Sequence, residues 1–235
     1  MRVMEKFDGS DYLAISVEKL LGRLLNDIEE KHAPKTLYIK GTMEIPLRRP
    51  RVSIIGSRKP SSSGLDASKT ITKALVEKQT VVVSGLAEGI DTAAHQTAIT
   101  TGGTTIAVLG TPLNKAYPAK NSPLQQEIMR NHLAISQFPA EHQTTPKDFV
   151  LRNLTMALIS DATVIVEASN TSGSLHQGWE ALRLGRPLFI WKPVLNDTLL
   201  KWPEKMLDYG AMVLFDPIDM FEILPSDLRM PDLFQ

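Results

Sequence analysis

The sequence contains no cysteine, which excludes disulfide bonds, thiolate nucleophiles and cysteine-based zinc sites. It also has no apolar run that approaches the roughly 20 residues needed to cross a bilayer. The first residues lack the hydrophobic stretch of a signal peptide. We therefore expect a cytoplasmic protein without a membrane partner.

Signatures of common nucleotide-binding and metal-binding classes are missing as well. No P-loop of the form G-x-x-x-x-G-K-[ST] occurs, and no G-x-G-x-x-G precedes an acidic ribose ligand at the usual distance. No cluster of His, Asp and Glu has the spacing of a metal site. These absences argue against a P-loop NTPase, and we expect neither a metal ion nor a dinucleotide cofactor.

Positive charge is concentrated in one part of a chain whose formal net charge is zero. The segment Lys35–Lys78 contains ten Lys and Arg residues against three Asp and Glu, whereas the last 25 residues contain five acidic groups and one Arg. A neutral total argues against indiscriminate binding to nucleic acid, but a local basic region can still bind phosphate. The charge pattern alone is equally typical of solvated surface.

Apolar, β-branched runs recur from residue 52 onward, and stretches with helical spacing separate most of them. The predicted strands are Val52–Ile55, Thr80–Ser84, Thr104–Leu109, Ala134–Gln137, Thr163–Glu167 and Pro187–Trp191. The predicted helices are Gly64–Lys78, Ile90–Thr101, Ser122–Asn131, Phe149–Ser160 and Ser174–Leu184. This alternation, with strands apolar throughout, predicts an α/β fold whose mostly parallel sheet is covered by helices on both faces.

The region before this alternation has a different pattern. Apolar residues at helical spacing predict one helix over Asp11–Lys31, capped by Ser10 or Asp11 and ended by Pro34. A short strand is predicted at Thr36–Gly41.

The first strand of the α/β region ends in a turn that indicates an anion site. Val52–Ile55 is followed by Gly56, Ser57, Arg58 and Lys59. In a parallel α/β sheet, ligands bind at the carboxyl ends of the strands. Glycine at position 56 permits close approach to the backbone, and Arg58 can grip a phosphate through two parallel hydrogen bonds. The turn therefore predicts a phosphate site.

Further segments at predicted strand ends combine small residues with possible ligand groups. In Ser84–His95, Gly85 and Gly89 permit unusual backbone angles or close approach, with Leu86 between them. The long segment Gly110–Asn121 is expected to fold over the sheet edge. Glycine-rich turns are also needed simply to leave a strand, but these segments all fall at one edge of the sheet, which favours a shared binding site.

The last such segment begins at Glu167 and places Ser172, Gly173 and Ser174 just before a helix. Free backbone N–H groups and hydroxyls at a helix start can bind an anion, although Ser-Gly-Ser often serves only as a cap. Glu167 itself is a candidate general base, ribose ligand or partner of Arg58.

The chain contains, in this order, the motifs SIIGSRKPSSSG, VVVSGLAEGIDTAAH, SQFP, DFVLRNLTMALISDATVIVEASNTSGSL and ALRLGRPLF. Together they closely resemble the DNA-processing protein A family, also called DprA or Smf. The resemblance extends from about Thr36 to Phe189, roughly two thirds of the chain.

This resemblance implies an extended Rossmann-like, doubly wound sheet that binds single-stranded DNA without acting as an enzyme. Members of the family protect single strands, load a RecA-type recombinase during natural transformation and form homodimers through this domain. We therefore expect single-stranded DNA, a RecA-type recombinase and a second copy of the chain as partners.

The family's site residues carry over onto matching positions. The Gly-Ser-Arg turn implies a phosphate pocket at Gly56–Lys59, and the family's Phe-x-x-Arg-Asn-Arg segment appears here as Phe149 to Leu154. Phe149 would lie beside a base, and Arg152 and the preceding Lys147 would meet phosphates. The predicted nucleic-acid-binding residues are Gly56, Ser57, Arg58, Lys59, Lys147, Phe149, Arg152, Asn153, Ser172, Gly173 and Ser174, with Gly85, Leu86, Gly89 and Glu167 lining the pocket.

The chain departs from the family pattern in three respects. Leu154 replaces the second Arg of the Arg-Asn-Arg segment, and Glu88 stands where relatives often have Arg. Typical members also carry a winged-helix domain after the Rossmann-like part. We expect a compact form with a helical extension and lead-in strand over 1–50, the DNA-processing domain over 51–215 and an acidic tail over 216–235.

Two other functions stay open at the level of sequence. The same fold superfamily includes nucleotide phosphoribohydrolases, so the pocket would instead hold a small nucleotide for sensing or N-glycosidic hydrolysis, with Arg58 on its phosphate and Glu167 near its ribose. The G-G-x-G-T-x-x-E pattern of those enzymes is absent. A protein-binding adaptor without a ligand is the other alternative, favoured by the lost charges at Glu88 and Leu154.

Overall fold

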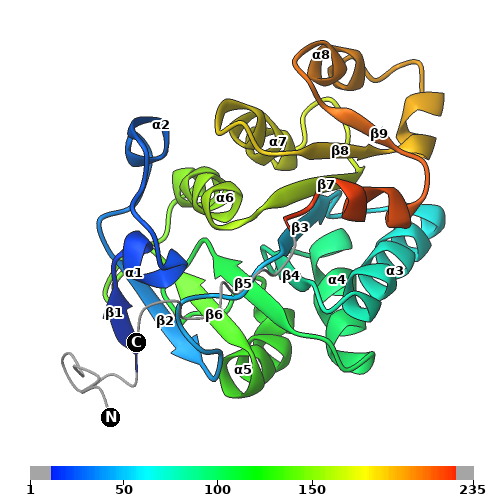
Figure 1. The fold of residues 1–235 in the computed structure, drawn as a ribbon. Helices are drawn as coiled ribbons and strands as arrows, with labels where there is room; N and C mark the ends of the chain where they lie inside the picture. The colour runs from blue at the N-terminus through cyan, green and yellow to red at the C-terminus, as the bar shows by residue number, and fades with distance from the viewer. Residues whose placement is uncertain (1–11, 226–235) are drawn as a thin grey trace.

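Nine strands pair into one sheet in the computed structural model, which describes residues 12–225 (Figure 1). The strands are β1 (Leu13–Ile15), β2 (Leu37–Gly41), β3 (Arg51–Gly56), β4 (Val81–Ser84), β5 (Thr105–Leu109), β6 (Leu133–Ser136), β7 (Ala162–Glu167), β8 (Leu188–Trp191) and β9 (Met212–Leu214). Their spatial order is β1-β2-β6-β5-β4-β3-β7-β8-β9. The pairs made by β1 and β2 are antiparallel, and those among β3 to β9 are parallel. The predicted mostly parallel α/β sheet is confirmed.

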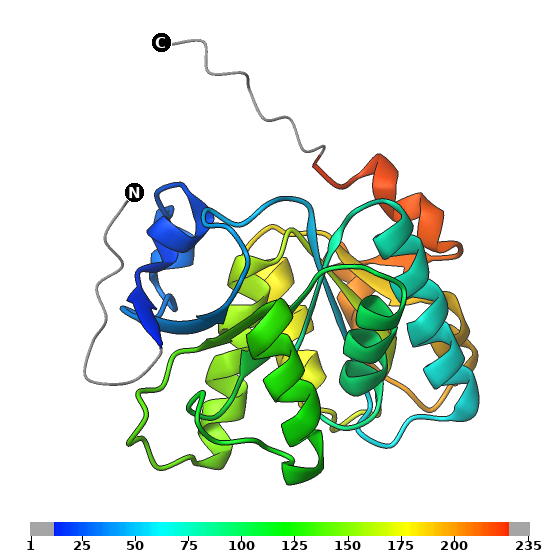
Figure 2. The same cartoon turned by 90° about the horizontal axis from the view of Figure 1, so that it is seen from below.

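Helices cover both faces of this sheet. They are α1 (Val17–Leu21), α2 (Asp27–Glu30), α3 (Ser62–Glu77), α4 (Ile90–Thr100), α5 (Ser122–Asn131), α6 (Pro146–Ile159), α7 (Ser174–Arg183) and α8 (Trp202–Asp208), with 3-10 helices η1 (Ala119–Asn121), η2 (Lys192–Asn196) and η3 (Pro217–Glu222). Figures 1 and 2 show α3, α4 and α5 on one face and α6 and α7 on the other. The direction of winding reverses between β3 and β7, which leaves a crevice at the carboxyl ends of these two strands.

The central strands are buried on both faces, which explains their almost continuous apolar sequence. In β3, Val52 and Ile54 pack into one cluster with Ile71 of α3, whereas Ile55 packs into the opposite cluster with Met156 of α6. All five side chains are at most 2% exposed. Burial of each of these side chains contributes roughly 1.5–3 kcal/mol to the stability of the fold. Packing against helices on both faces therefore holds β3 in a fixed position.

The predicted single helix over Asp11–Lys31 is wrong, because capping residues divide this segment. After β1, Ser16 begins α1, and its hydroxyl accepts a hydrogen bond from the N–H of Lys19 at 3.3 Å. Gly22 ends α1 in the left-handed region at φ 71°. Asn26 then begins α2 through a capping box. These local hydrogen bonds override the helical spacing of the apolar residues.

Some predictions lie outside the described residues, namely the caps Ser10 and Asp11 and the part of the tail over 226–235. The described part of that tail forms η3, which packs against α3. Strand β2 hydrogen-bonds to β6, so one sheet crosses the predicted boundary at residue 50, and the division into three segments stays a prediction. Within residues 12–225, every helix is too short or too polar to cross a membrane.

A buried carboxylate attaches the N-terminal segment to the rest of the fold. Glu29 of α2 accepts hydrogen bonds from Arg23 at 2.6 and 2.7 Å and from Arg186 at 2.8 Å. Arg183 of α7 donates to the carbonyl of Ile28 at 2.9 Å. The hydrogen bonds from Arg23 lower the pKa of Glu29 to about 2, although burial opposes them. Glu29 therefore stays ionised well below the ordinary pKa of a carboxyl group.

Glu29 makes the stability of this attachment sensitive to acid. Because its pKa is lower in the folded chain than in the unfolded chain, its contribution is complete above about pH 4.5 and is lost as the pH falls toward 2. We predict that Glu29→Gln lowers the free energy of unfolding by about 1–3 kcal/mol at neutral pH. The difference from the unsubstituted chain should shrink as the pH falls through this window, as measured by urea unfolding. An equal loss in Glu30→Gln, at an exposed position of α2, would contradict this role.

Candidate nucleic-acid interface

The carboxyl ends of β3, β4 and β7 border a cavity of about 530 Å³, and α6 and α7 complete its walls. We refer to it as the strand-end cavity. The predicted binding residues that line it are Gly56, Ser57, Arg58, Lys59, Phe149, Arg152, Asn153, Ser172, Gly173 and Ser174. Lys147 is exposed in the first turn of α6, outside this lining. The fold therefore brings together three segments that lie far apart in the sequence.

The turn after β3 holds its cations on a fixed backbone. The N–H of Ser57 donates to the carbonyl of Glu167 at 2.7 Å, which joins the ends of β3 and β7. Gly56 is required by close approach, because a Cβ there would lie 2.8 Å from the same carbonyl. Beyond this fixed point, the side chains of Arg58 and Lys59 are exposed to solvent. An anion can therefore reach both cations without a rearrangement of the backbone.

Arg58 lies over an aromatic ring. Its Cζ atom is 5.9 Å from the centre of the Phe149 ring, and among the described residues no carboxylate forms an ion pair with it. Phe149 is held in place by Gly110, where a Cβ would come within 2.5 Å of the ring, and by Tyr117, whose ring centre is 5.1 Å away. This pair offers a cation for phosphate beside a flat surface for a base.

Arg152 has a different environment from Arg58. It is only 4% exposed, and its guanidinium donates to the carbonyl of Gly85, to the carbonyl of Val108 at 2.8 Å and to Asn153 at 2.9 Å. Burial lowers the pKa of Arg152 to about 10, and the nearby Asp91 opposes this shift. These hydrogen bonds tie the ends of β4 and β5 to α6. A phosphate contact of Arg152 remains a prediction, whereas its structural role is visible.

The loop before α7 is tied to the same helix. Asn153 donates to the carbonyl of Gly173 at 3.0 Å, which fixes one side of the loop against α6. Within the loop, the hydroxyl of Ser172 accepts from the N–H of Ser169 at 3.1 Å. The hydroxyl of Ser174 is buried and has no partner among the described residues. Asn153 therefore fixes the loop from outside, and the hydroxyl of Ser174, the first residue of α7, has no partner within residues 12–225.

Three residues predicted to line this pocket have other positions. Leu86 is fully buried in the core because its side chain is apolar, and its backbone has φ 57°. Gly89 lines a separate cavity beside α3 and α4. The carboxylate of Glu167 caps α3, since it accepts from both the N–H and the hydroxyl of Ser61, and it does not pair with Arg58. Within residues 12–225, no three His, Asp or Glu side chains could hold a metal ion.

An acidic side chain lies close to Arg58. Glu88 lines a small cavity together with Arg58 and the fourth predicted lining residue, Gly85. It also forms an ion pair with Lys120 at 2.9 Å. Glu88 therefore weakens the positive potential of this region in two ways, by its own charge and by neutralising Lys120.

Gln177, a buried polar residue in the wall of the strand-end cavity, is not among the residues predicted from the sequence. Its side chain is 0% exposed although it belongs to α7, and its oxygen and nitrogen have no partner among the described residues. The only signal in the sequence is its position three residues after Ser174, which places both residues on one helix face.

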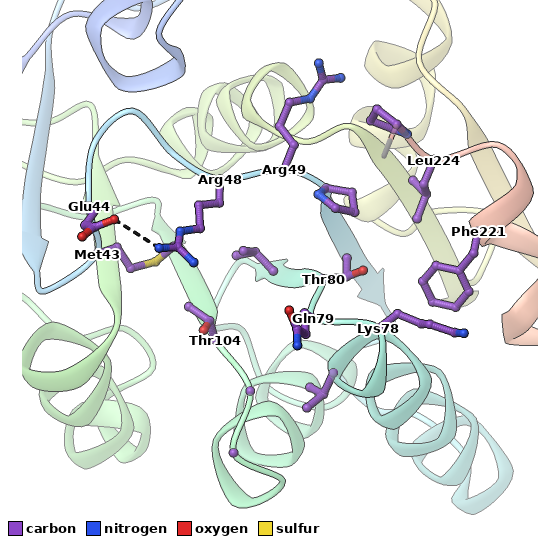
Figure 3. A pocket seen from close by; sticks show the side chains of 16 residues that line it. Met43, Glu44, Arg48, Arg49, Lys78, Gln79, Thr80, Thr104, Phe221 and Leu224 are labelled. Atoms are coloured by element: carbon purple, nitrogen blue, oxygen red, sulfur yellow. Dashed lines mark hydrogen bonds and ion pairs between the residues drawn. The ribbon is translucent and has the colours of Figure 1, made fainter. Parts of the chain in front are cut away.

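A second cavity, of about 630 Å³, lies at the opposite edge of the sheet (Figure 3). It borders the amino ends of β3, β4 and β5, and its lining includes Arg48 and Arg49 from the basic segment Lys35–Lys78. Figure 3 shows Arg48 directed at Glu44, with which it pairs at 3.2 Å. Arg49 and the buried Arg51 both pair with Asp161, at 2.8 and 3.3 Å. Because these arginines already have carboxylate partners, the strand-end cavity is the better anion site.

Comparison with known proteins identifies the relatives of the chain. A family model described as DNA recombination-mediator protein A matches residues 13–225. The chain is 32% identical to DNA processing protein DprA of Bacillus subtilis over 82% of its length, and 36% identical to DNA processing protein DprA of Streptococcus pneumoniae over 77%. It spans about two thirds of the length of these curated relatives, 65% and 64%.

Solved structures share the fold. The X-ray structure of DNA processing protein A from Streptococcus pneumoniae matches with a TM-score of 0.79 at 32% identity, over 92% of this chain and 75% of that one. DNA processing protein A from Helicobacter pylori, described for its single-stranded DNA binding mode, matches with a TM-score of 0.76 at 26% identity, over 92% and 96%. The Rossmann-like fold and the family resemblance are therefore confirmed.

We predict that Arg152→Met lowers the free energy of unfolding by about 1–3 kcal/mol, the range for leaving a buried polar group without its hydrogen-bond partner. The loss arises because Asp91 and the carbonyls of Gly85 and Val108 would be left buried without the guanidinium. Thermal and urea unfolding measure the change. Arg130→Met, at an exposed position of α5, should differ from the unsubstituted chain by less than about 0.5 kcal/mol. Full stability of Arg152→Met would contradict the structural role.

Proposed function

The chain belongs to the DNA recombination-mediator protein A family, and from this premise we propose that it binds single-stranded DNA in the strand-end cavity. The observation that carries the proposal is the arrangement of Arg58 over Phe149, at 5.9 Å, beside an open cavity. Arg58 binds a phosphate, Lys59 adds charge, and the ring of Phe149 stacks on a base.

A single strand fits this arrangement better than a duplex. In a duplex the faces of the bases are stacked on one another, so an aromatic ring cannot reach them unless a base is flipped out. In a single strand, successive bases can stack on side chains while the phosphates follow a positive groove. The contacts are made to phosphates and ring faces, so little dependence on base sequence follows.

We infer that the protein binds DNA and does not hydrolyse a nucleotide. The position of Glu167, the acidic residue at this edge of the sheet, supports this inference. A general base needs a free lone pair close to its substrate. The carboxylate of Glu167 accepts hydrogen bonds from the N–H and the hydroxyl of Ser61 at the start of α3, and it lines a neighbouring cavity and not the strand-end cavity. This arrangement favours DNA binding over the alternative of N-glycosidic hydrolysis.

Family membership also supports a wider role. We infer that the protein protects single strands in the cytoplasm during DNA uptake and recombination, loads a RecA-type recombinase onto them and acts as a homodimer. The DNA-binding step is the part of this role that the strand-end cavity supports directly.

We predict that Arg58→Ala weakens binding to a single-stranded oligonucleotide by about 1–3 kcal/mol, the scale of one hydrogen bond to a charged group. The slope of the logarithm of affinity against the logarithm of salt concentration should also decrease by about 0.7 for each lost phosphate contact. Fluorescence anisotropy over a salt series measures both quantities.

The matched control for this substitution is Arg130→Ala, which removes an equal charge from an exposed position near the amino end of β6. It should retain both the affinity and the salt dependence. An Arg58→Ala protein that binds as tightly as this control would contradict the proposed site.

We predict that Glu88→Gln strengthens binding to the same oligonucleotide about two- to fivefold, because it removes a negative charge beside Arg58 and releases Lys120 from its ion pair. The gain should disappear at high salt, where exposed charges are screened. Glu77→Gln, which makes the same change of charge at the far end of α3, should leave the affinity unchanged. A similar gain in both variants would indicate a general effect of net charge.

A further inference from the structure

One side chain in the strand-end cavity has hydrogen-bonding groups that no other part of the described chain satisfies. Gln177, in the first turn of α7, is 0% exposed and lines the cavity. Within residues 12–225, neither its Oε1 nor its Nε2 has a partner, and the hydroxyl of Ser174 has none either. Buried polar atoms of native proteins are nearly always paired. Three unpaired atoms in one wall therefore indicate a ligand with polar groups.

A second carboxamide in the same cavity, that of Asn153, is held by hydrogen bonds within the protein. Asn153 accepts from Arg152 at 2.9 Å and donates to the carbonyl of Gly173 at 3.0 Å, so its orientation is fixed. Gln177 has no such anchors. Its amide can turn over and present its oxygen and its NH₂ group in either order.

We propose that Gln177 pairs with the hydrogen-bonding edge of a nucleobase that enters the strand-end cavity. This inference rests on the proposed function, because the base belongs to the strand whose phosphate lies on Arg58. A carboxamide presents an acceptor beside a donor, which complements the adjacent donor and acceptor on the edge of a base. Phe149 lines the same cavity and supplies a surface for the face of the base. Edge pairing combined with stacking is how proteins bind unstacked bases.

Neither end of the Gln177 amide is held by a partner within residues 12–225, and this determines the kind of selectivity. A base that presents a donor followed by an acceptor and one that presents the reverse order are both accommodated, because Gln177 can adopt either orientation. The cavity therefore requires a base at one position of the strand but does not select one base. The contact with Gln177 is therefore tested with an oligonucleotide in which one base is missing or has a blocked hydrogen-bonding edge.

The test uses short oligothymidylates that carry one abasic residue or one N3-methylthymine at successive positions. N3-methylation removes the donor of the thymine edge and leaves the phosphate backbone unchanged. For the unsubstituted full chain, fluorescence anisotropy should show one position at which either change weakens binding about tenfold. Gln177→Met should bind the unmodified oligonucleotide about tenfold more weakly and show no further loss on N3-methylation at that position. The abasic residue should still weaken its binding, because the contact of the base with Phe149 is lost as well.

Gln177→Glu serves as a second variant, because it keeps the length of the side chain and replaces the donor by an acceptor. Because a carboxylate still accepts a hydrogen bond from the N3–H of thymine, this variant should keep the penalty for N3-methylation. Circular dichroism establishes which variants fold. Gln126→Leu, at an exposed position of α5, is the control and should keep the full penalty. A penalty for N3-methylation that persists in Gln177→Met, or that disappears in Gln177→Glu, overturns the inference. The proposed function fails separately, if Arg58→Ala binds unmodified oligothymidylate as tightly as the unsubstituted chain.

Discussion

The carboxyl edge of the sheet depends on one buried guanidinium, that of Arg152. It donates to the carbonyl of Gly85, which directly follows β4, and to that of Val108, near the carboxyl end of β5. The next residue, Asn153, holds the loop before α7 through the carbonyl of Gly173. Burial of a charge is costly, and the lowered pKa of Arg152 reflects that cost, which Asp91 partly offsets. Loops from three strands thus take their positions from two adjacent residues of α6.

The same topology separates two kinds of arginine. At the amino edge of the sheet, Arg49 and Arg51 share the carboxylate of Asp161, so their charges contribute to stability. At the carboxyl edge, Arg58 lies over Phe149 on a backbone that β7 holds in place. A chain of zero net charge can therefore offer a local anion site, because Arg49 and Arg51 have a carboxylate partner whereas Arg58 forms no ion pair among the described residues. The fixed backbone lowers the entropy lost when a strand binds.

Much of the fold could be predicted because the strands are apolar on both faces, and the cavity because loops after parallel strands meet at one edge. Prediction failed where a short-range contact decided the outcome. Gly22 ends a helix that apolar spacing alone would continue. It also failed where burial depends on distant packing. Leu86 faces the core although it lies between two glycines, and Gln177 lies in the cavity although its helix positions carry no ligand motif.

We propose that the DNA strand lies at the carboxyl edge of the sheet. Hydrogen–deuterium exchange of the full chain, with and without a single-stranded oligonucleotide, tests it most directly, because the two cavities occupy opposite edges of the sheet. We expect the oligonucleotide to slow amide exchange in the segments 56–60, 85–91, 146–153 and 169–177. Protection confined to the segments 43–50, 78–81 and 102–104, which line the cavity in Figure 3, would contradict it.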